Sequence, residues 1–69
     1  MDLLWMSNGR RVGIEVKRAD APTLTPSMRI ALTDLRLDEL NIIYPGTRPY
    51  ELAPRVKVIP VSDLPGLGA

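Results

Sequence analysis

Asn8-Gly9 is the sequence feature that most constrains the fold of this chain. It lies between two apolar stretches, and a type I′ turn favours Asn-Gly because both of its central residues need a positive φ. A two-residue turn also fixes the strand register, because Ser7 then lies opposite Arg10 and every further pair follows by counting outward. The sequence therefore predicts a hairpin whose strands are residues 2–6 and 11–17.

Side chains alternate between the two faces of each strand of this hairpin. One face is apolar and carries Leu3, Trp5, Val12, Ile14 and Val16. The other face is mixed and carries Asp2, Leu4, Met6, Arg11, Gly13, Glu15 and Lys17. We expect the helix that follows the hairpin to cover the apolar face.

The mixed face brings together a candidate metal site. In the predicted register Asp2 lies opposite Glu15, and Lys17 is one step along the same face. Two opposed carboxylates are destabilising unless a cation lies between them, and Mg²⁺ is usually held by one or two carboxylates with waters and phosphate oxygens. A neighbouring lysine can stabilise charge on a phosphate. The pattern predicts a site for Mg²⁺ or Mn²⁺ that could cut phosphodiesters; an ordinary polar strand face remains the alternative.

One helix and a third strand are expected after the hairpin. Thr25-Pro26 is typical of a helix start, with Thr25 as the N-cap and Pro26 at the first helical position, and the helix is expected to run to about Leu37. Residues 40–44 are predicted to form the third strand. A strand, a helix and a strand in this order favour a parallel crossover.

The last third of the chain predicts one more strand. Residues 47–54 contain two prolines and are expected to be a loop, whereas residues 55–61 are expected to form a strand at a sheet edge, because Pro60 has no N–H to donate. The expected fold is therefore β-β-α-β-β, a mixed four-stranded sheet with one main helix, in the α/β (α+β) class. Residues 1–64 are expected to form a single domain and residues 65–69 a flexible tail.

Composition limits the chemistry that the chain can perform. The 69 residues include no cysteine and no histidine, which excludes Ser-His-Asp, Cys-His and His-ligated zinc sites formed by this chain alone. Nine basic and eight acidic residues give no strong overall attraction to nucleic acid. Arg10, Arg11 and Arg18 do cluster in sequence around the second strand, where they could hold phosphates of DNA; solvated charges at the strand ends are the alternative.

Nothing in the sequence predicts an association with membranes. No stretch approaches the ~18 apolar residues that a membrane span needs. The N-terminus lacks a basic region followed by an apolar stretch, and Asp2 argues against a signal peptide. The expected compartment is the cytoplasm.

The order of the motif residues resembles a known family. Asp2 on one strand, followed by Glu15-Val16-Lys17 on the next, resembles the PD-(D/E)xK motif of restriction-endonuclease-like nucleases. More narrowly, the segments 1–5, 13–17 and 24–27 are similar to the C-terminal nuclease-like domain of a prokaryotic AAA-type ATPase family. The resemblance covers most of residues 1–61. Family members have a helix and a strand before the motif aspartate, so the resemblance implies a truncated core that lacks them and the ATPase.

The resemblance also implies roles for the motif residues. Asp2, Glu15 and the Val16 carbonyl would bind Mg²⁺ or Mn²⁺, and Lys17 would lie near the attacking water or the scissile phosphate. If the site is not active, no cofactor is expected. The enzymatic prediction is thus a metal-dependent DNA nuclease that uses Asp2, Glu15 and Lys17.

A non-catalytic role is the other prediction, and it is the one we favour. One helix can cover only one face of the sheet, and residues 40–44 are apolar on both sides. We therefore expect an uncovered, partly apolar sheet face and a homodimer formed through it, with a monomer as the alternative. In this interpretation the chain is an accessory or dimerisation module left from a larger ATPase-associated protein.

Overall fold

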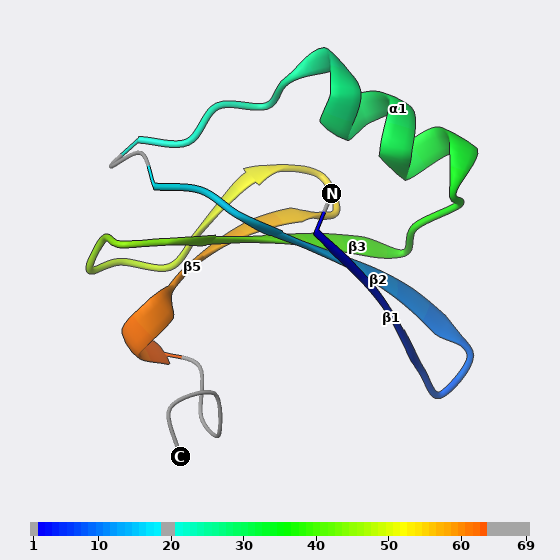
Figure 1. The fold of residues 1–69 in the computed structure, drawn as a ribbon, viewed down its shortest axis with the longest axis horizontal. Coiled ribbons are helices and arrows are strands. Elements are labelled where there is room, and N and C mark those ends of the chain that lie inside the picture. The colour runs from blue at the N-terminus through cyan, green and yellow to red at the C-terminus, as the bar shows by residue number, and fades with distance from the viewer. Residues whose placement is uncertain (1, 19–20, 64–69) are drawn as a thin grey trace.

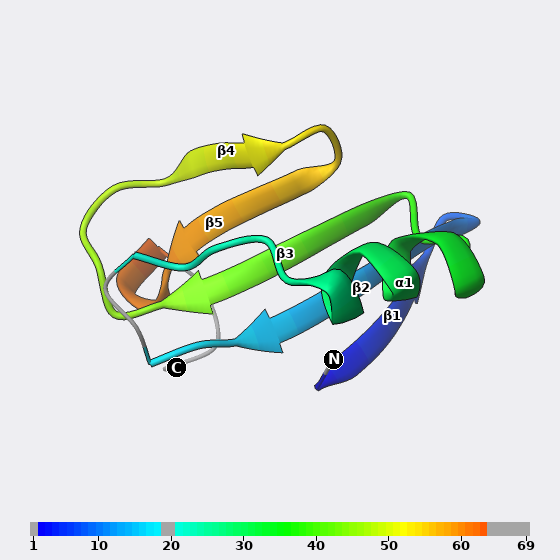
Figure 2. The same ribbon diagram turned by 90° about the horizontal axis from the view of Figure 1, so that it is seen from above.

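A five-stranded mixed sheet with one helix on one of its faces makes up the fold (Figure 1). The computed structural model describes residues 2–18 and 21–63. In chain order the elements are β1 (Leu3–Ser7), β2 (Arg10–Val16), α1 (Pro26–Asp34), β3 (Glu39–Tyr44), β4 (Tyr50–Ala53), β5 (Val56–Pro60) and the 3₁₀ helix η1 (Val61–Asp63). The strand order across the sheet is β1-β2-β3-β5-β4 (Figure 2). The expected α/β (α+β) class, with a mixed sheet and one main helix, is confirmed.

The hairpin turn forms as the sequence predicts. Asn8 and Gly9 both have positive φ, 51° and 79°, as a type I′ turn requires. Ser7 pairs with Arg10, and the antiparallel register continues to Leu3 opposite Ile14. The predicted register is therefore confirmed for these five pairs, although the ladder ends one step before Asp2.

The connection through α1 joins two parallel strands, as expected. β2 and β3 pair in parallel, and α1 lies over these two strands (Figure 2). β5 also runs parallel to β3, while β4 turns back and pairs with β5 antiparallel. The sheet is thus parallel in its centre and antiparallel at both edges.

The start of α1 matches the sequence prediction. Thr25 has an extended backbone, and its hydroxyl accepts a hydrogen bond from the Met28 N–H at 3.3 Å, which is the N-cap interaction. Pro26 is the first helical residue. Met28 and Leu32 are buried against the sheet, while Ala31 and Leu35 pack at the margin of the core.

The helix ends earlier than predicted, at Asp34 rather than near Leu37. Arg36 has a φ of 50°, and its N–H donates to the Thr33 carbonyl while the Leu37 N–H donates to the Leu32 carbonyl. This is a Schellman motif, which closes the last helical turn and folds Leu37 back onto Leu32 in the core. Apolar periodicity alone did not reveal this end, because Leu37 is buried after the helix has stopped.

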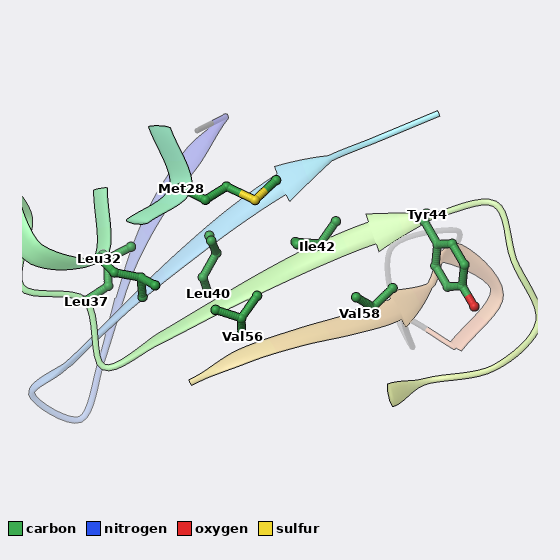
Figure 3. Packing of buried hydrophobic residues seen from close by; sticks show 8 residues of the cluster. All are labelled: Met28, Leu32, Leu37, Leu40, Ile42, Tyr44, Val56 and Val58. Carbon is green, nitrogen blue, oxygen red and sulfur yellow. The ribbon is translucent and has the colours of Figure 1, made fainter. Parts of the chain in front are cut away.

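The helix covers the face opposite to the expected one. Gly13 pairs with Leu40 and Glu15 with Ile42, so the mixed face of the hairpin continues into the apolar face of β3. The core between α1 and the sheet consists of Met28, Leu32, Leu37, Leu40, Ile42, Tyr44, Val56 and Val58 (Figure 3). The prediction that α1 packs on Leu3, Trp5 and Val16 is wrong, and these three side chains are exposed. α1 packs on the face that carries the buried apolar residues of β3 and β5. These contribute more to the core than the apolar residues of the hairpin do.

The sheet has five strands rather than the predicted four. Residues 47–54 were expected to be a loop, but β4 forms within them and turns into β5 at Pro54-Arg55. Arg55 has a φ of 68°, at the turn position where glycine is usual, so the glycine that would have marked this turn is absent from the sequence. β5 is consequently not an edge strand. Pro60 is tolerated because it lies at the end of β5, beyond Val58, the last residue that pairs with β4.

The helices of the described residues are short. Within residues 2–18 and 21–63, α1 is the longest helix, and neither it nor η1 has the length or apolarity needed to cross a bilayer. The predicted flexible tail, residues 65–69, lies outside the described residues.

Candidate functional site

The Asp2 carboxylate is held by the backbone of the neighbouring strand. Its Oδ2 accepts a hydrogen bond from the Val16 N–H at 2.7 Å, and the Asp2 N–H donates to the Ile14 carbonyl at 3.0 Å. The expected ladder pair of Asp2 with Glu15 is therefore absent from the strand register, which stops at Leu3. The Asp2 side chain instead accepts a hydrogen bond from a β2 amide just past the end of the ladder.

Glu15 and Lys17 lie on the side of the sheet that α1 covers. The Glu15 side chain is only 14% exposed, and its Oε1 is 4.0 Å from the Lys17 Nζ. Glu15 borders a hollow of about 10 Å³ together with α1 residues Ser27, Met28 and Ala31. A hollow of that volume holds about one water molecule.

These positions test whether the predicted metal ligands fit a divalent cation. Asp2 already uses one carboxylate oxygen on the Val16 N–H, and Glu15 faces Lys17 beneath α1. Among residues 2–18 and 21–63, no group of three or more Asp, Glu, His or Cys side chains could hold a metal ion. The Mg²⁺ or Mn²⁺ site expected from the sequence, with two carboxylates and the Val16 carbonyl, stays a prediction.

The three arginines predicted to bind phosphate are not brought together. Arg10 and Val16 are the two ends of β2, six residues or roughly 20 Å apart along the strand, and Arg18 lies two residues beyond Val16. Arg11 is engaged in the fold, because its Nε donates to the Leu35 carbonyl at 2.6 Å and its N–H to the Asp38 Oδ2 at 2.7 Å. Arg11 thus ties β2 to the segment between α1 and β3.

A charged cluster on the uncovered face was missed by the sequence prediction. Glu39 lies just outside the predicted third strand, residues 40–44, but it begins β3 and its side chain is only 18% exposed. Its Oε1 lies 3.1 Å from the Lys57 Nζ and 3.8 Å from the Arg10 Nη2. The polar residues Glu39 and Asn41 alternate with buried Leu40 and Ile42, and this period of two is the signal that could have placed them on a strand.

The pKa of Glu39 reflects this environment. Partial burial by itself raises the pKa, but hydrogen bonds from Lys57 and Asn41 and the charges of Lys57 and Arg10 together outweigh it. The pKa of Glu39 is therefore lowered, and the carboxylate is ionised at neutral pH. The Asn41 Oδ1 is buried and accepts no hydrogen bond from the described part of the chain. Asn41 is also one of the residues that line an open hollow of about 440 Å³ on the uncovered face, together with Trp5 and Val12.

Exposed apolar side chains are concentrated on β1. All five β1 residues are exposed, and they include Leu3, Leu4, Trp5 and Met6. Apolar side chains therefore meet solvent on both faces of this edge strand. Such a surface is unusual for an isolated domain and is typical of an interface.

Comparison with known proteins finds two mycobacterial relatives. The uncharacterised proteins Rv2008c of Mycobacterium tuberculosis and Mb2031c of Mycobacterium bovis are each 39% identical to this chain over 64 residues. The match covers 93% of this chain but only 14% of either relative, so the chain spans about one seventh of their length. No family model matches the chain, and no solved structure matches it at a significant level.

Proposed function

We propose that this chain is a non-catalytic accessory module that joins two copies of the protein to which it belongs. The observation that carries the proposal is the exposure of every residue of β1, including four large apolar side chains. Removing such surface from water is worth about 25 cal/mol per Å², so association is the favourable outcome for this strand.

The geometry of the predicted metal ligands supports a non-catalytic role. Asp2 is engaged by the Val16 amide, and Glu15 lies beneath α1 beside Lys17. The hollow of about 10 Å³ beside Glu15 is far too small to admit a phosphodiester. In this arrangement Asp2 holds the end of the hairpin, and Glu15 and Lys17 form an ion pair.

The relatives support a role within a larger protein. Each is far longer than the 64 residues that match, so the same segment serves there as one part of a longer chain. Our proposal keeps the origin suggested by the motif residues, a restriction-endonuclease-like core of an ATPase-associated protein. It also keeps the cytoplasm as the compartment.

Sedimentation equilibrium over a wide concentration range tests the proposal, with a parallel titration of Mg²⁺ and Mn²⁺. We expect reversible dimers and no metal-dependent shift of the Glu15, Val16 and Lys17 amide signals in NMR spectra. A monomer at all concentrations would refute the module. Metal-dependent shifts together with cleavage of plasmid DNA, lost in Glu15→Ala and Lys17→Ala, would establish the nuclease instead.

A further inference from the structure

We propose that β1 pairs edge to edge with β1 of a second copy of this chain, antiparallel and centred on Trp5. Two five-stranded sheets would then form one continuous sheet. The inference rests on the proposed self-association and identifies the surface and the register through which it occurs.

The outer edge of β1 has backbone groups available for such pairing. Arg11 pairs with Met6, yet its N–H and carbonyl turn away from β1 and bond to the carboxylate and the N–H of Asp38, at 2.7 and 2.8 Å. In an antiparallel ladder, pairs that turn away from each other alternate with pairs that exchange hydrogen bonds. Leu4 and Met6 therefore direct their N–H and carbonyl groups outward. In the described part of the chain, β2 is the only strand beside β1.

The opposite edge of the sheet shows what a protected edge looks like. β4 has only four residues, its register with β5 shifts between Glu51 and Ala53, and prolines 49 and 54 flank it. Short strands, irregular registers, charges and prolines are the features that keep edge strands from pairing with other chains. β1 has a regular register of five pairs and contains neither a charged residue nor a proline. Of the two edges, β1 is the one suited to pairing.

The β1 sequence is compatible with itself across a two-fold axis. With Trp5 opposite Trp5 of the partner subunit, Leu4 lies opposite the partner's Met6, and Leu3 opposite the partner's Ser7. The outward groups of Leu4 and Met6 then fall in the hydrogen-bonded pairs, so four backbone bonds form across the axis. The two Trp5 residues form the closer, non-hydrogen-bonded pair, and no like charges are opposed.

Association through the uncovered sheet face is less favourable than this edge pairing. That face carries Glu39 with Lys57 and Arg10, and burying such a cluster has a desolvation cost that can exceed the gain from its ion pairs. Edge pairing leaves the cluster in water. A short edge also buries less area than a standard interface, so we expect a reversible dimer with a dissociation constant in the micromolar range.

A cross-linking experiment tests the register directly. The chain has no cysteine, so Trp5→Cys gives one thiol in each copy, and the proposed pair has a Cα separation of roughly 4.5 Å, within the range that a disulfide spans. Ile30→Cys places an equally exposed thiol on the outer side of α1, since the two native side chains are 56% and 57% exposed. Under mild oxidation we expect covalent dimers to form at least about tenfold faster for Trp5→Cys than for Ile30→Cys.

Charge substitutions test the same edge without removing tryptophan. Met6 and Ile30 are 58% and 57% exposed, so Met6→Lys and Ile30→Lys add the same charge at equal exposure. We expect Met6→Lys to raise the dissociation constant at least about tenfold and Ile30→Lys to leave it unchanged. Emission of the single tryptophan, Trp5, should shift to shorter wavelength with concentration in the wild type but not in Met6→Lys.

The outcomes separate this inference from the proposed function. Rapid cross-linking of Trp5→Cys together with weakened association of Met6→Lys supports edge pairing. Dimers that tolerate Met6→Lys, and that cross-link no faster for Trp5→Cys than for Ile30→Cys, would overturn edge pairing while leaving self-association in place. A chain that is monomeric at every concentration would overturn both.

Discussion

The Asp2 carboxylate accepts a 2.7 Å hydrogen bond from the backbone N–H of Val16. The bond joins the segment before β1 to the far end of β2, so a residue predicted to bind metal fixes the end of the hairpin. A carboxylate that accepts a backbone N–H in this way forms a charge-assisted hydrogen bond.

Removing this bond should loosen the hairpin. We expect Asp2→Ala to lower the free energy of unfolding by about 1 kcal/mol, because an exposed hydrogen bond to a charged group lies at the lower end of its range. Asp2→Asn keeps an acceptor oxygen and should lose less. Urea denaturation at a fixed protein concentration measures both. Asp63→Ala, at an exposed residue of η1, is the control, and an effect of Asp2→Ala no larger than that of Asp63→Ala would contradict the assignment.

The left-handed residue after α1 offers a stabilising substitution. Arg36 has a φ of 50° in the Schellman motif, where glycine is favoured because it has no Cβ. We expect Arg36→Gly to raise stability by about 0.5–1 kcal/mol, equivalent to roughly 4 °C in the melting temperature of a domain this small. Arg36→Ala, which keeps a Cβ, should give no such gain. A lower melting temperature for Arg36→Gly would show that the guanidinium contributes to the fold.

The packing of the Tyr44 ring should require glycine at position 46. The Tyr44 hydroxyl donates to the Arg48 carbonyl at 2.6 Å, and a Cβ on Gly46 would overlap the Tyr44 ring. Gly46→Ala should cost about 1–3 kcal/mol, as overpacking does, although Gly46 has no positive φ. Gly9→Ala is the contrasting variant, since open space surrounds a Cβ there and the positive φ alone should cost about 1 kcal/mol. Thermal unfolding compares them, and a neutral Gly46→Ala would contradict the packing.

The lowered pKa of Glu39 predicts a specific loss of stability in acid. A carboxyl whose pKa is lower in the folded state contributes stability above its unfolded pKa, about 4.5, and loses it as the pH falls through the folded pKa. We expect Glu39→Gln to be less stable than the wild type at pH 7, by about 0.5–1 kcal/mol, and we expect the difference to shrink as the pH is lowered to about 3. Urea midpoints at the two pH values decide this. A difference that stays constant with pH would mean that the charge of Glu39 is not involved.

Local signals in the sequence predicted most of the elements. Asn8-Gly9 set the hairpin register and Thr25-Pro26 set the start of α1, because each depends on the backbone preferences of two adjacent residues. β4 was missed because its turn has Arg55 where glycine is the usual residue. The face that α1 covers was mispredicted because it depends on apolar residues summed over all strands, and β3 and β5 decide that sum.

The candidate site was harder to predict than the fold. Asp2, Glu15 and Lys17 do lie near the same end of the hairpin, as the register requires. The sequence could not show that the Val16 N–H would occupy the Asp2 carboxylate, because that bond forms only where the ladder stops. The exposure of β1 could not be predicted from the sequence either, because it follows from the position of α1 over β2 and β3.

Amide hydrogen exchange along β1, measured at low and high protein concentration, tests the central claim most directly. Leu4 and Met6 direct their N–H groups outward, whereas the Trp5 N–H faces β2. We predict that exchange at Leu4 and Met6 slows as the concentration rises and that Trp5 is protected at both concentrations. Equal exchange of Leu4 and Met6 at the two concentrations, extending well above the micromolar range, would contradict the account.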